Sequence, residues 1–325
     1  MGSSTSAALT LSLTGPFRRQ GTDAAEGVKL WAQATGAEVT LVDDRGAKRA
    51  AAEAYAAWVD RTDLLLGPYS SGLVRAVAPV VTPADRLLWN HGGSADDLAQ
   101  PGVVSLPAPA STYFNRAVDE ARARGADRLI LVRDAGPFAR AVAIGAVARA
   151  AEHGLHAQVV DAEAVAAEAA GRTAFLVAGH FEHDIEVVRN LQDRSPLLLG
   201  AVAAGIAAFG QELGPVADGV LGPVQWWPEA RTPEVGPSGV EFARRYQDRT
   251  GHQPSYVAAQ AAAAGYLAHA AFQRGLTATD IARWRTSTLL GDFALDADWR
   301  QVGHRATTVC WQSGRMVPLA YGPTT

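Results

Sequence analysis

The stretch of residues 64–98 constrains the fold most strongly, because the same local pattern occurs in it twice. In each copy, an apolar run is followed by a turn of glycine and small hydroxyl residues, and then by the start of a helical pattern. The first copy has Leu64–Leu66 before a turn at residues 67–72, and the second has residues 87–89 before a turn at residues 90–94. Strands that alternate with helices in this way are typical of βαβ units and parallel sheets.

The two turns also predict a binding site for an anion. Ligands of α/β sheets lie at the carboxyl ends of the strands, where helix N-termini converge. The free N–H groups and the positive end of the helix dipole favour a carboxylate or a phosphate there. If the turns at residues 67–72 and 90–94 lie close together, they form what we call the anion cradle. The alternative is that their glycine and serine residues serve only as turn and N-cap residues.

The alternation of strands and helices continues through the chain and restarts after residue 111, beyond a proline-rich segment. Strands are predicted at residues 7–13, 38–42, 64–66, 87–89, 103–106, 128–132, 157–160, 173–177, 196–199, 219–224, 293–295, 306–312 and 316–320. Helices are predicted at residues 22–33, 48–58, 73–81, from 96 onward, 114–124, 138–151, 162–170, 181–191, 203–213, 239–249, 256–274 and near 279. This order predicts the α/β class, with two similar Rossmann-like lobes built on parallel-rich sheets.

The composition is that of a globular chain long enough for two lobes, with 325 residues of which 48% are hydrophobic and 19% are charged. A formal net charge of -4 and the lack of a lysine or arginine run give no support to a nucleic-acid partner. No apolar segment approaches the roughly 18–20 residues that a bilayer span needs. The N-terminal sequence lacks a charged and apolar leader pattern, so we expect either a cytosolic protein or one whose signal peptide has been removed.

The motifs of common enzyme classes do not occur. The single cysteine, Cys310, excludes an intramolecular disulfide and a cysteine-based metal cluster, and it is predicted to be a buried strand thiol. Neither a P-loop nor a GxGxxG turn is present. The sequence His91-Gly92-Gly93 superficially resembles a lipase oxyanion loop, but the GxSxG nucleophile elbow is missing. We therefore expect no catalytic residue and no cofactor.

The densest group of potential metal ligands is His180, Glu182, His183 and Asp184, and it matches no zinc pattern. We expect structural or ligand-contact roles for these residues rather than metal binding. Glu182 and Asp184 fall in the first turn of a predicted helix, where the helix dipole stabilises acids. His180 precedes that helix and would face the crevice.

Trp226 and Trp227 follow a predicted strand and precede a proline. Adjacent side chains of an extended segment point to opposite sides. One tryptophan could therefore line a cleft while the other packs, and a core position is an equal alternative.

Four segments together resemble one family. They are residues 13–16 (Leu-Thr-Gly-Pro) with Gly21, residues 67–72 (Gly-Pro-Tyr-Ser-Ser-Gly) with Ala78-Pro79, residues 90–94 leading to Leu98, and residues 251–256 (Gly-His-Gln-Pro-Ser-Tyr) before a long alanine-rich helix. In their order and spacing, the chain resembles type I periplasmic solute-binding proteins of the branched-chain amino acid (Leu/Ile/Val) group of ABC transporters. The resemblance covers nearly the whole chain.

The resemblance implies two α/β lobes joined by a hinge of three crossovers, near residues 107–110, 225–228 and 302. The ligand would bind in the interlobe cleft, and the hinge would close on it. The N-terminal lobe would comprise residues 1–112 plus 227–302. The C-terminal lobe would comprise residues 113–226 plus 303–325.

The resemblance also implies which residues contact the ligand. In the family, a carboxylate is held at positions that match Ser71, Gly92 and Ser94, which agrees with the anion cradle. Cleft aromatics of the family match Gln20, Phe138 and His180; Phe138 keeps the ring, and the other two replace it with polar groups. The remaining predicted ligand contacts are Tyr69, His91, Val202 and Trp226.

One position departs from the family and affects the choice of ligand. Amino-acid binders of this group pair the ligand ammonium with an acidic residue, and the matching position falls near Val202, where no acid is nearby in sequence. A buried ammonium without a counter-charge is costly, commonly by a few kcal/mol. Either another acid such as Glu182 supplies the charge, or the ligand is an aromatic, aliphatic or keto acid without an α-ammonium.

Three classes of function follow. The first is a monomeric extracytoplasmic solute receptor, periplasmic or anchored outside the cell, with a small carboxylate or amino-acid ligand and an ABC permease as partner. The second is a ligand-sensing module of a signalling or regulatory system. The third is an α/β enzyme with His180, His183 or His91 as general base, for which the sequence shows no nucleophile or metal. We favour the first.

Overall fold

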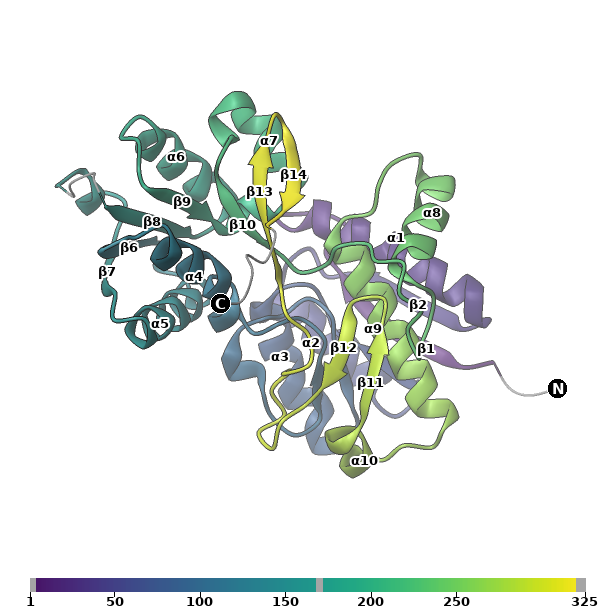
Figure 1. Ribbon diagram of the computed structural model, residues 1–325. Helices are drawn as coiled ribbons and strands as arrows, with labels where there is room; N and C mark the ends of the chain where they lie inside the picture. Colours follow the sequence, from purple (N-terminus) through teal and green to yellow (C-terminus); the bar gives the residue numbers. More distant parts are fainter. Residues whose placement is uncertain (1–3, 168–171, 320–325) are drawn as a thin grey trace. The chain divides into compact units, whose positions relative to one another are not determined.

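The computed structural model describes residues 4–167 and 172–319, and its chain divides into two compact units (Figure 1). Unit 1 comprises Met1–Ala108 and Trp226–Arg305, and unit 2 comprises Pro109–Gln225 and Ala306–Thr325. Each unit is an α/β sandwich around its own sheet. The predicted α/β class, with two lobes built on parallel-rich sheets, is confirmed.

Unit 1 contains a five-stranded parallel sheet in the order β2-β1-β3-β4-β5. Its strands are β1 (Ser6–Leu11), β2 (Glu38–Asp43), β3 (Leu64–Leu66), β4 (Leu88–Asn90) and β5 (Val103–Ser105). Side chains alternate between the two faces, as the period of a strand requires. Leu9 and Leu66 belong to one hydrophobic cluster, whereas Ala8 and Leu65 belong to the other.

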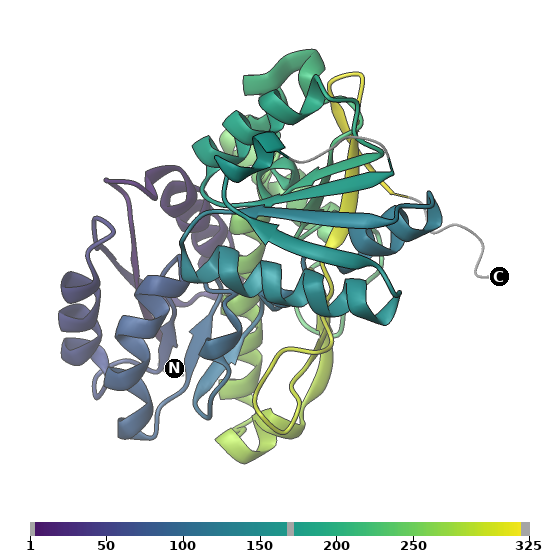
Figure 2. The ribbon, with the colours of Figure 1, turned by 90° about the vertical axis from the view of Figure 1, so that its left-hand side faces the viewer.

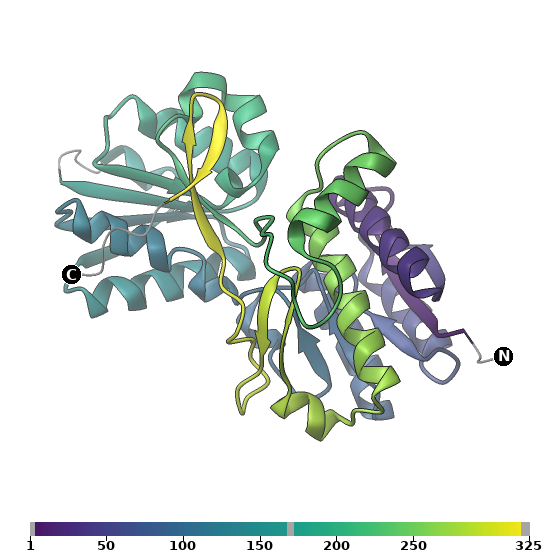
Figure 3. The same cartoon turned by 45° about the vertical axis from the view of Figure 1, so that its right-hand side comes forward.

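Helices cover both faces of the unit 1 sheet. One face packs against α1 (Arg18–Thr35), α8 (Gly239–Thr250) and α9 (Tyr256–Gln273), which lie side by side in Figure 3. The other face packs against α2 (Lys48–Trp58) and α3 (Ser71–Val81). Unit 1 is completed by α10 (Ala278–Arg283), by the hairpin of β11 (Arg285–Thr288) and β12 (Gly291–Ala294), and by the 3-10 turns η1 (Thr82–Ala84) and η2 (Asp96–Leu98).

Unit 2 contains a seven-stranded sheet in the order β14-β13-β10-β9-β8-β6-β7. The parallel strands are β6 (Arg128–Arg133), β7 (His156–Val160), β8 (Thr173–Ala178), β9 (Leu198–Ala201) and β10 (Leu221–Val224); β13 (Thr307–Gln312) and β14 (Arg315–Pro318) add an antiparallel edge. Cys310 lies buried in β13, as predicted.

Helices also cover both faces of the unit 2 sheet, as Figure 2 shows. One face packs against α4 (Asn115–Ala123) and α5 (Pro137–Glu152), and the other against α6 (Phe181–Gln192) and α7 (Ala207–Leu213). The short 3-10 turns of this unit are η3 (Ala110–Thr112), η4 (Ala164–Ala167), η5 (Val202–Gly205) and η6 (Gly214–Ala217). None of the helices in the described ranges has the length and hydrophobicity needed to cross a bilayer.

The parallel strands of the two units have the same order, 2-1-3-4-5 when numbered within each unit. The order therefore reverses between β1 and β3 in unit 1, and between β6 and β8 in unit 2. At such a switch point the two following helices lie on opposite faces, as α5 and α6 do, and leave a crevice at the carboxyl ends of the strands. Ligands of open α/β sheets bind at these points.

The structure differs from the prediction at four elements, of which three were predicted as longer helices. The helix expected from residue 96 is only η2, and Pro101 follows shortly after, where it disfavours helical backbone before it. The helix expected at 162–170 is the turn η4, and residues 168–170 lie outside the described ranges. The helix expected at 203–213 begins only at α7, because the side chains of Asp184 and Trp311 hydrogen-bond to the backbone of residues 203 and 204.

The fourth difference is β11, which was not predicted because its sequence, Arg-Thr-Ser-Thr, has no apolar alternation. Two of its buried hydroxyl groups bond to Glu234, whose carboxylate accepts from Thr286 and whose N–H donates to Ser287 Oγ, and the third, Thr288 Oγ1, accepts the Leu290 N–H. Hydrogen bonds therefore stabilise this strand where hydrophobic side chains are few.

Candidate functional site

The two turns of the anion cradle lie side by side in unit 1. Tyr69 and Gly92 form a parallel bridge, and the Ser70 N–H donates to the Gly92 carbonyl at 3.2 Å. Ser71 Oγ accepts the N–H groups of Ser94 at 3.2 Å and of Ala95 at 3.1 Å. The predicted proximity of the two turns is confirmed by these contacts.

Ser71 is oriented to donate a hydrogen bond to a ligand. A hydroxyl group has two acceptor lone pairs and one proton, and the two N–H groups from the second turn occupy the acceptor side of Ser71. Its proton therefore remains for an acceptor outside the cradle. Ser71 is also the first residue of α3, where N–H groups have no partner within the helix, and no acid lies in the first turn. These donors together suit an anion.

The backbone of Ser70 adopts an unusual conformation. Its φ of 99° and ψ of 142° fall in a region that residues other than glycine rarely occupy. Two bonds hold it there: its N–H donates to Gly92 O, and its Oγ accepts the Leu73 N–H at 3.4 Å. Strain of this kind is concentrated at binding sites, where the fold fixes a conformation that a ligand requires.

Gly92 contributes close packing rather than a free donor. A Cβ atom at this position would lie 2.5 Å from the Tyr69 Cα, so that only glycine lets the two turns approach. The Gly92 and Gly93 N–H groups both donate to Asn90 Oδ1, at 3.1 and 2.8 Å. The donors that the cradle leaves open are therefore the Ser71 and Ser94 hydroxyls and the first N–H groups of α3.

Aromatic side chains adjoin the first turn. The Tyr69 and Tyr256 hydroxyls are 3.0 Å apart, and the Phe17 ring lies edge-on to Tyr69 with centroids 6.0 Å apart. Burial raises the pKa of Tyr256 well above its usual value, so this hydroxyl stays protonated and can donate. Gln20, on the first turn of α1, is half-buried. Tyr256 and Phe17 were not among the predicted contacts.

Two predicted ligand contacts belong instead to the interior of unit 1. His91 is 0% exposed, and neither ring nitrogen has a hydrogen-bond partner among the described residues. Trp226 is buried in the main hydrophobic cluster, and its Nε1–H donates to Leu289 O at 2.9 Å. Trp226 is therefore a core residue, which was the alternative to lining a cleft. His91 is buried beneath the anion cradle and is not part of its surface.

In unit 2, three predicted contacts lie at the carboxyl ends of strands. Phe138 is half-buried in the first turn of α5, with its ring edge-on to Tyr113 at 5.6 Å. His180 precedes α6 as its N-cap residue, and 67% of its side chain is exposed. Val202 follows β9 and is half-buried. Each follows a different strand of the sheet, and the three positions lie along the same edge.

Asp184 is an acid that contacts the segment after Val202. Its side chain is fully buried, and Oδ2 accepts the Ala203 N–H at 2.9 Å while Oδ1 lies 3.3 Å from His183 Nδ1. Desolvation raises the pKa of Asp184, and the Asp184 contact raises the pKa of His183. Because both of its oxygens are engaged and no part is exposed, Asp184 holds the polypeptide in place and does not face a ligand.

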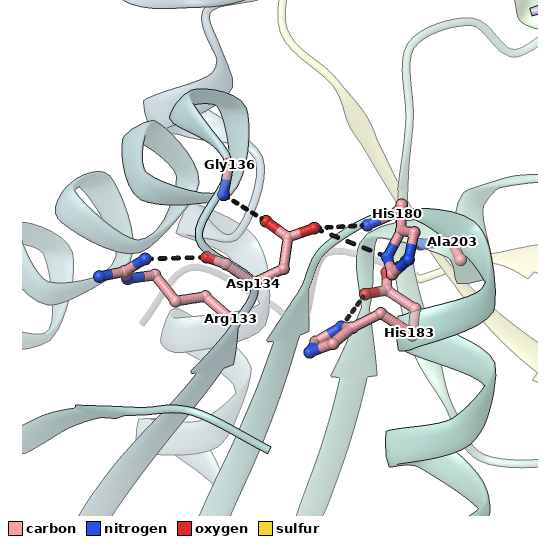
Figure 4. A network of polar contacts seen from close by, with 7 residues as sticks. Arg133, Asp134, Gly136, His180, His183 and Ala203 are labelled. Carbon is pink, nitrogen blue, oxygen red and sulfur yellow. Dashed lines mark hydrogen bonds and ion pairs between the residues drawn. The ribbon is translucent and has the colours of Figure 1, made fainter. Parts of the chain in front are cut away.

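Asp134 is an acid at the carboxyl ends of the unit 2 strands that the sequence analysis did not single out. It follows β6 directly, and its carboxylate accepts the N–H groups of Gly136 and His180 at 2.7 and 2.9 Å (Figure 4). Its place immediately after a strand could have revealed it in the sequence. The same feature identified the two turns of the anion cradle. Within residues 4–167 and 172–319, no group of three or more His, Cys, Asp or Glu side chains could hold a metal ion.

The sequence and the fold were compared with those of known proteins. The sequence profile of the periplasmic binding protein family matches residues 5–183, more than half of the chain. No curated protein matches.

Many solved structures share the fold. The leucine-binding protein LivK of Thermotoga maritima has a TM-score of 0.82 at 17% identity, over 97% of this chain and 98% of that one. The branched-chain amino acid transporter substrate-binding protein LivJ of Streptococcus pneumoniae, in complex with isoleucine, has a TM-score of 0.78 at 18% identity, over 98% and 100%. An ABC transporter solute-binding protein of R. palustris, in complex with benzoate, has a TM-score of 0.74 at 15% identity, over 98% and 96%. As the sequence motifs predicted, the chain belongs to the periplasmic binding protein family.

Proposed function

We propose that this chain is the solute-binding component of an ABC importer. It works outside the cytoplasm without catalysis, and it delivers a small carboxylate-bearing solute to a membrane permease. Two proteins of similar fold support the class of ligand, because one is in complex with isoleucine and another with benzoate. Both of these ligands carry a carboxylate.

The observation that carries the proposal is the hydroxyl of Ser71. Its lone pairs accept two N–H groups, so its proton is available to an acceptor, and it lies at the N-terminus of an eleven-residue helix. The N–H groups at that end add further donors and a positive partial charge. A carboxylate matches this set, since it accepts hydrogen bonds only.

The other proposed ligand contacts decide which carboxylate binds. In unit 1 they are Gln20, Tyr69 and Ser94, with Gly92 as the position that lets the two turns approach, and in unit 2 they are Phe138, His180 and Val202. The half-buried rings of Tyr69 and Phe138 favour a solute with an apolar part, because aromatic side chains bury such groups at small entropic cost. The candidates are amino acids and aromatic, aliphatic or keto acids.

Isothermal titration with a panel of such acids, on the wild type and on Ser71→Ala, tests the proposal. We expect at least one acid to bind the wild type, and Ser71→Ala to raise its Kd about tenfold to a hundredfold, since a hydrogen bond to a charged group contributes about 1.5–3 kcal/mol. Ser71→Thr, which keeps the hydroxyl, should retain most of the affinity.

The matched control is Ser238→Ala. Like Ser71, Ser238 lies at the start of a helix of unit 1 and accepts a backbone N–H: it is the N-cap residue of α8, and its Oγ accepts the Glu241 N–H at 3.2 Å. This variant should lose stability comparably while the Kd stays unchanged. The proposal is wrong if no carboxylate binds the wild type, or if Ser71→Ala and Ser238→Ala bind equally well.

A further inference from the structure

Tyr69 connects the anion cradle to two helices of unit 1. It belongs to the first turn, directly before Ser70, and its backbone forms the parallel bridge with Gly92 of the second turn. Its side chain contacts the start of both helices. The hydroxyl group meets that of Tyr256, the first residue of α9, and the ring meets that of Phe17, the N-cap residue of α1. One side chain therefore links the two turns to the ends of α1 and α9.

The Tyr69 ring packs closely against the second turn. A Cβ atom at Gly92 would lie 3.0 Å from Tyr69 Cδ2, as well as 2.5 Å from the Tyr69 Cα. Carbon atoms in ordinary contact are about 3.5–4.0 Å apart. The ring and the backbone of Tyr69 thus both fill the space beside Gly92, and a ring that turned away would remove part of the packing between the two turns.

The hydroxyl pair fixes the orientation of this ring. The contact with Phe17 is an edge-on apolar contact at 6.0 Å between centroids, which tolerates sliding, whereas the hydroxyl contact with Tyr256, at 3.0 Å, is a hydrogen bond with a preferred direction. Tyr256 is itself held in place, because most residues of the eighteen-residue helix α9 are buried in the main cluster of unit 1. It therefore offers Tyr69 a rigid partner.

Holding Tyr69 matters because the next residue has a strained backbone. The φ of 99° at Ser70 persists only where the surrounding structure fixes it. Ser71 follows, and its Oγ accepts the N–H groups of Ser94 at 3.2 Å and Ala95 at 3.1 Å. If the first turn relaxed to an ordinary conformation, the Ser71 hydroxyl would move away from these two groups and from the anion that it is proposed to bind.

We propose that Tyr256 is a positioning residue for the anion cradle: its hydroxyl holds Tyr69 so that the two turns are already arranged for an anion before it binds. This inference rests on the proposed function and adds a residue outside the two turns to it. The effect is on affinity, because a site that is ordered in advance loses less conformational entropy when it binds. Tyr256 acts through Tyr69 and does not itself contact the ligand.

Hydrogen exchange of the ligand-free protein, measured by NMR, tests the positioning directly. The Ser94 and Ala95 amide protons report on the cradle, because both are donated to Ser71 Oγ. Tyr256→Phe removes only the hydroxyl and should make these two amides exchange at least threefold faster. The amides of the central strand β3 should keep their rates, which distinguishes local loosening from a loss of global stability.

Titration calorimetry measures the effect on affinity. The probes are leucine, benzoate, isovalerate and α-ketoisocaproate, one acid from each candidate class. For the acid that binds most tightly, Tyr256→Phe and Tyr69→Phe should each raise the Kd about threefold to tenfold, as the loss of a hydrogen bond between neutral groups predicts. The double variant should bind no more weakly than the weaker single variant, because both substitutions remove the same bond.

Tyr266→Phe is the matched control. Tyr266 is a half-buried tyrosine of the same helix, and its ring packs beside Gly236. It lies ten residues beyond Tyr256, which is about 15 Å along the axis of α9. This variant should leave the exchange rates of the cradle amides and the Kd unchanged.

The outcomes separate this inference from the proposed function. If acids bind in a Ser71-dependent way, and Tyr256→Phe changes neither the exchange of the cradle amides nor the Kd, the positioning role is wrong and the proposed function stands. Additive effects of Tyr256→Phe and Tyr69→Phe would also overturn it, because the two hydroxyls would then act separately. If no carboxylate binds the wild type, the proposed function is wrong, and so is this inference.

Discussion

At the scale of single residues, His91 lies in an environment that disfavours a charged group. Its ring is fully buried, and neither nitrogen has a partner among the described residues. Desolvation lowers the pKa of His91 to about 4. A histidine with a depressed folded-state pKa takes up its proton more readily in the unfolded chain, so the native state loses stability as the pH falls through the interval between the two values.

We therefore expect His91 to cause acid sensitivity between about pH 6.5 and pH 4. A shift of this size corresponds to about 3 kcal/mol of unfolding free energy, present above pH 6.5 and lost as the pH approaches 4. His91→Leu should be nearly neutral at pH 7, because it removes a buried polar group without a partner, and should flatten the pH dependence. Denaturant unfolding at a series of pH values measures both effects.

The exposed His156, in β7, serves as the control position for this prediction. His156→Leu should leave the pH dependence of the wild type intact. If His91→Leu shows the same acid sensitivity as the wild type, burial of His91 is not its cause.

The sequence allows prediction of a residue such as Ser71, because its surroundings are local. The turn, the start of the helix and the hydroxyl all lie within residues 67–72, and the second turn follows one strand later. The place of Asp134 depends instead on the pairing of β6 with β8, whose contacting residues are about 45 positions apart. The burial of His91 likewise depends on tertiary packing, because a histidine after an apolar strand is compatible with either environment.

At the scale of elements, Asp184 joins the start of α6 to the segment after β9. Its carboxylate accepts the Ala203 N–H and contacts His183, and it has no exposed surface. Removing the carboxylate leaves a buried N–H without an acceptor and deprives His183 of its partner. The helix and the following turn η5 thus depend on one side chain for their mutual position.

Asp184→Ala should reduce the unfolding free energy by about 3 kcal/mol, and Asp184→Asn by less, because the amide oxygen can still accept the Ala203 N–H. The control is Asp193→Ala, since Asp193 is exposed at the other end of α6. Urea unfolding of the three variants measures the difference. Equal stability of Asp184→Ala and Asp193→Ala would show that the buried contact contributes nothing.

The pH dependence of this difference has a definite sign. The pKa of His183 is raised, chiefly by its contact with Asp184. The stability that this pair adds is therefore complete below the usual histidine pKa of about 6.5. It is lost as the pH rises through the raised pKa of His183. The raised pKa of Asp184 acts in the same direction. The deficit of Asp184→Ala relative to the wild type should therefore shrink as the pH is increased from 6 toward 9. A deficit that grows over this range would contradict the pairing.

At the scale of the whole molecule, the chain forms the same order of five parallel strands twice. The repetition of strands and helices predicted two α/β lobes, because each hydrophobic run leaves a periodic trace in the sequence. The strand order and the face that each helix covers could not be predicted in the same way, because they depend on pairings between distant segments. The switch points, and with them the site, follow from that order.

Ligand binding to the folded chain should appear as thermal stabilisation of the whole molecule. An acid present at 100 times its Kd should raise the unfolding free energy by about 2.7 kcal/mol if it binds only the native state. A thermal-shift panel of the candidate acids measures this, and at the same ligand concentration Ser71→Ala should reduce the stabilisation to about 0.4–1.4 kcal/mol, as a tenfold to hundredfold higher Kd requires. An equal shift in both proteins would place the ligand away from the anion cradle.

The division of unit 1 into two stretches of sequence bears on how the chain is made. The strands β1–β5 leave the ribosome first, but α9, which packs on Leu9, Leu66 and the rest of one sheet face, is translated only after residues 109–225. Until α9 has been translated, it cannot cover that apolar face of the unit 1 sheet. Unit 1 therefore cannot complete its fold until nearly all of the chain has been translated, although its sheet strands are made first.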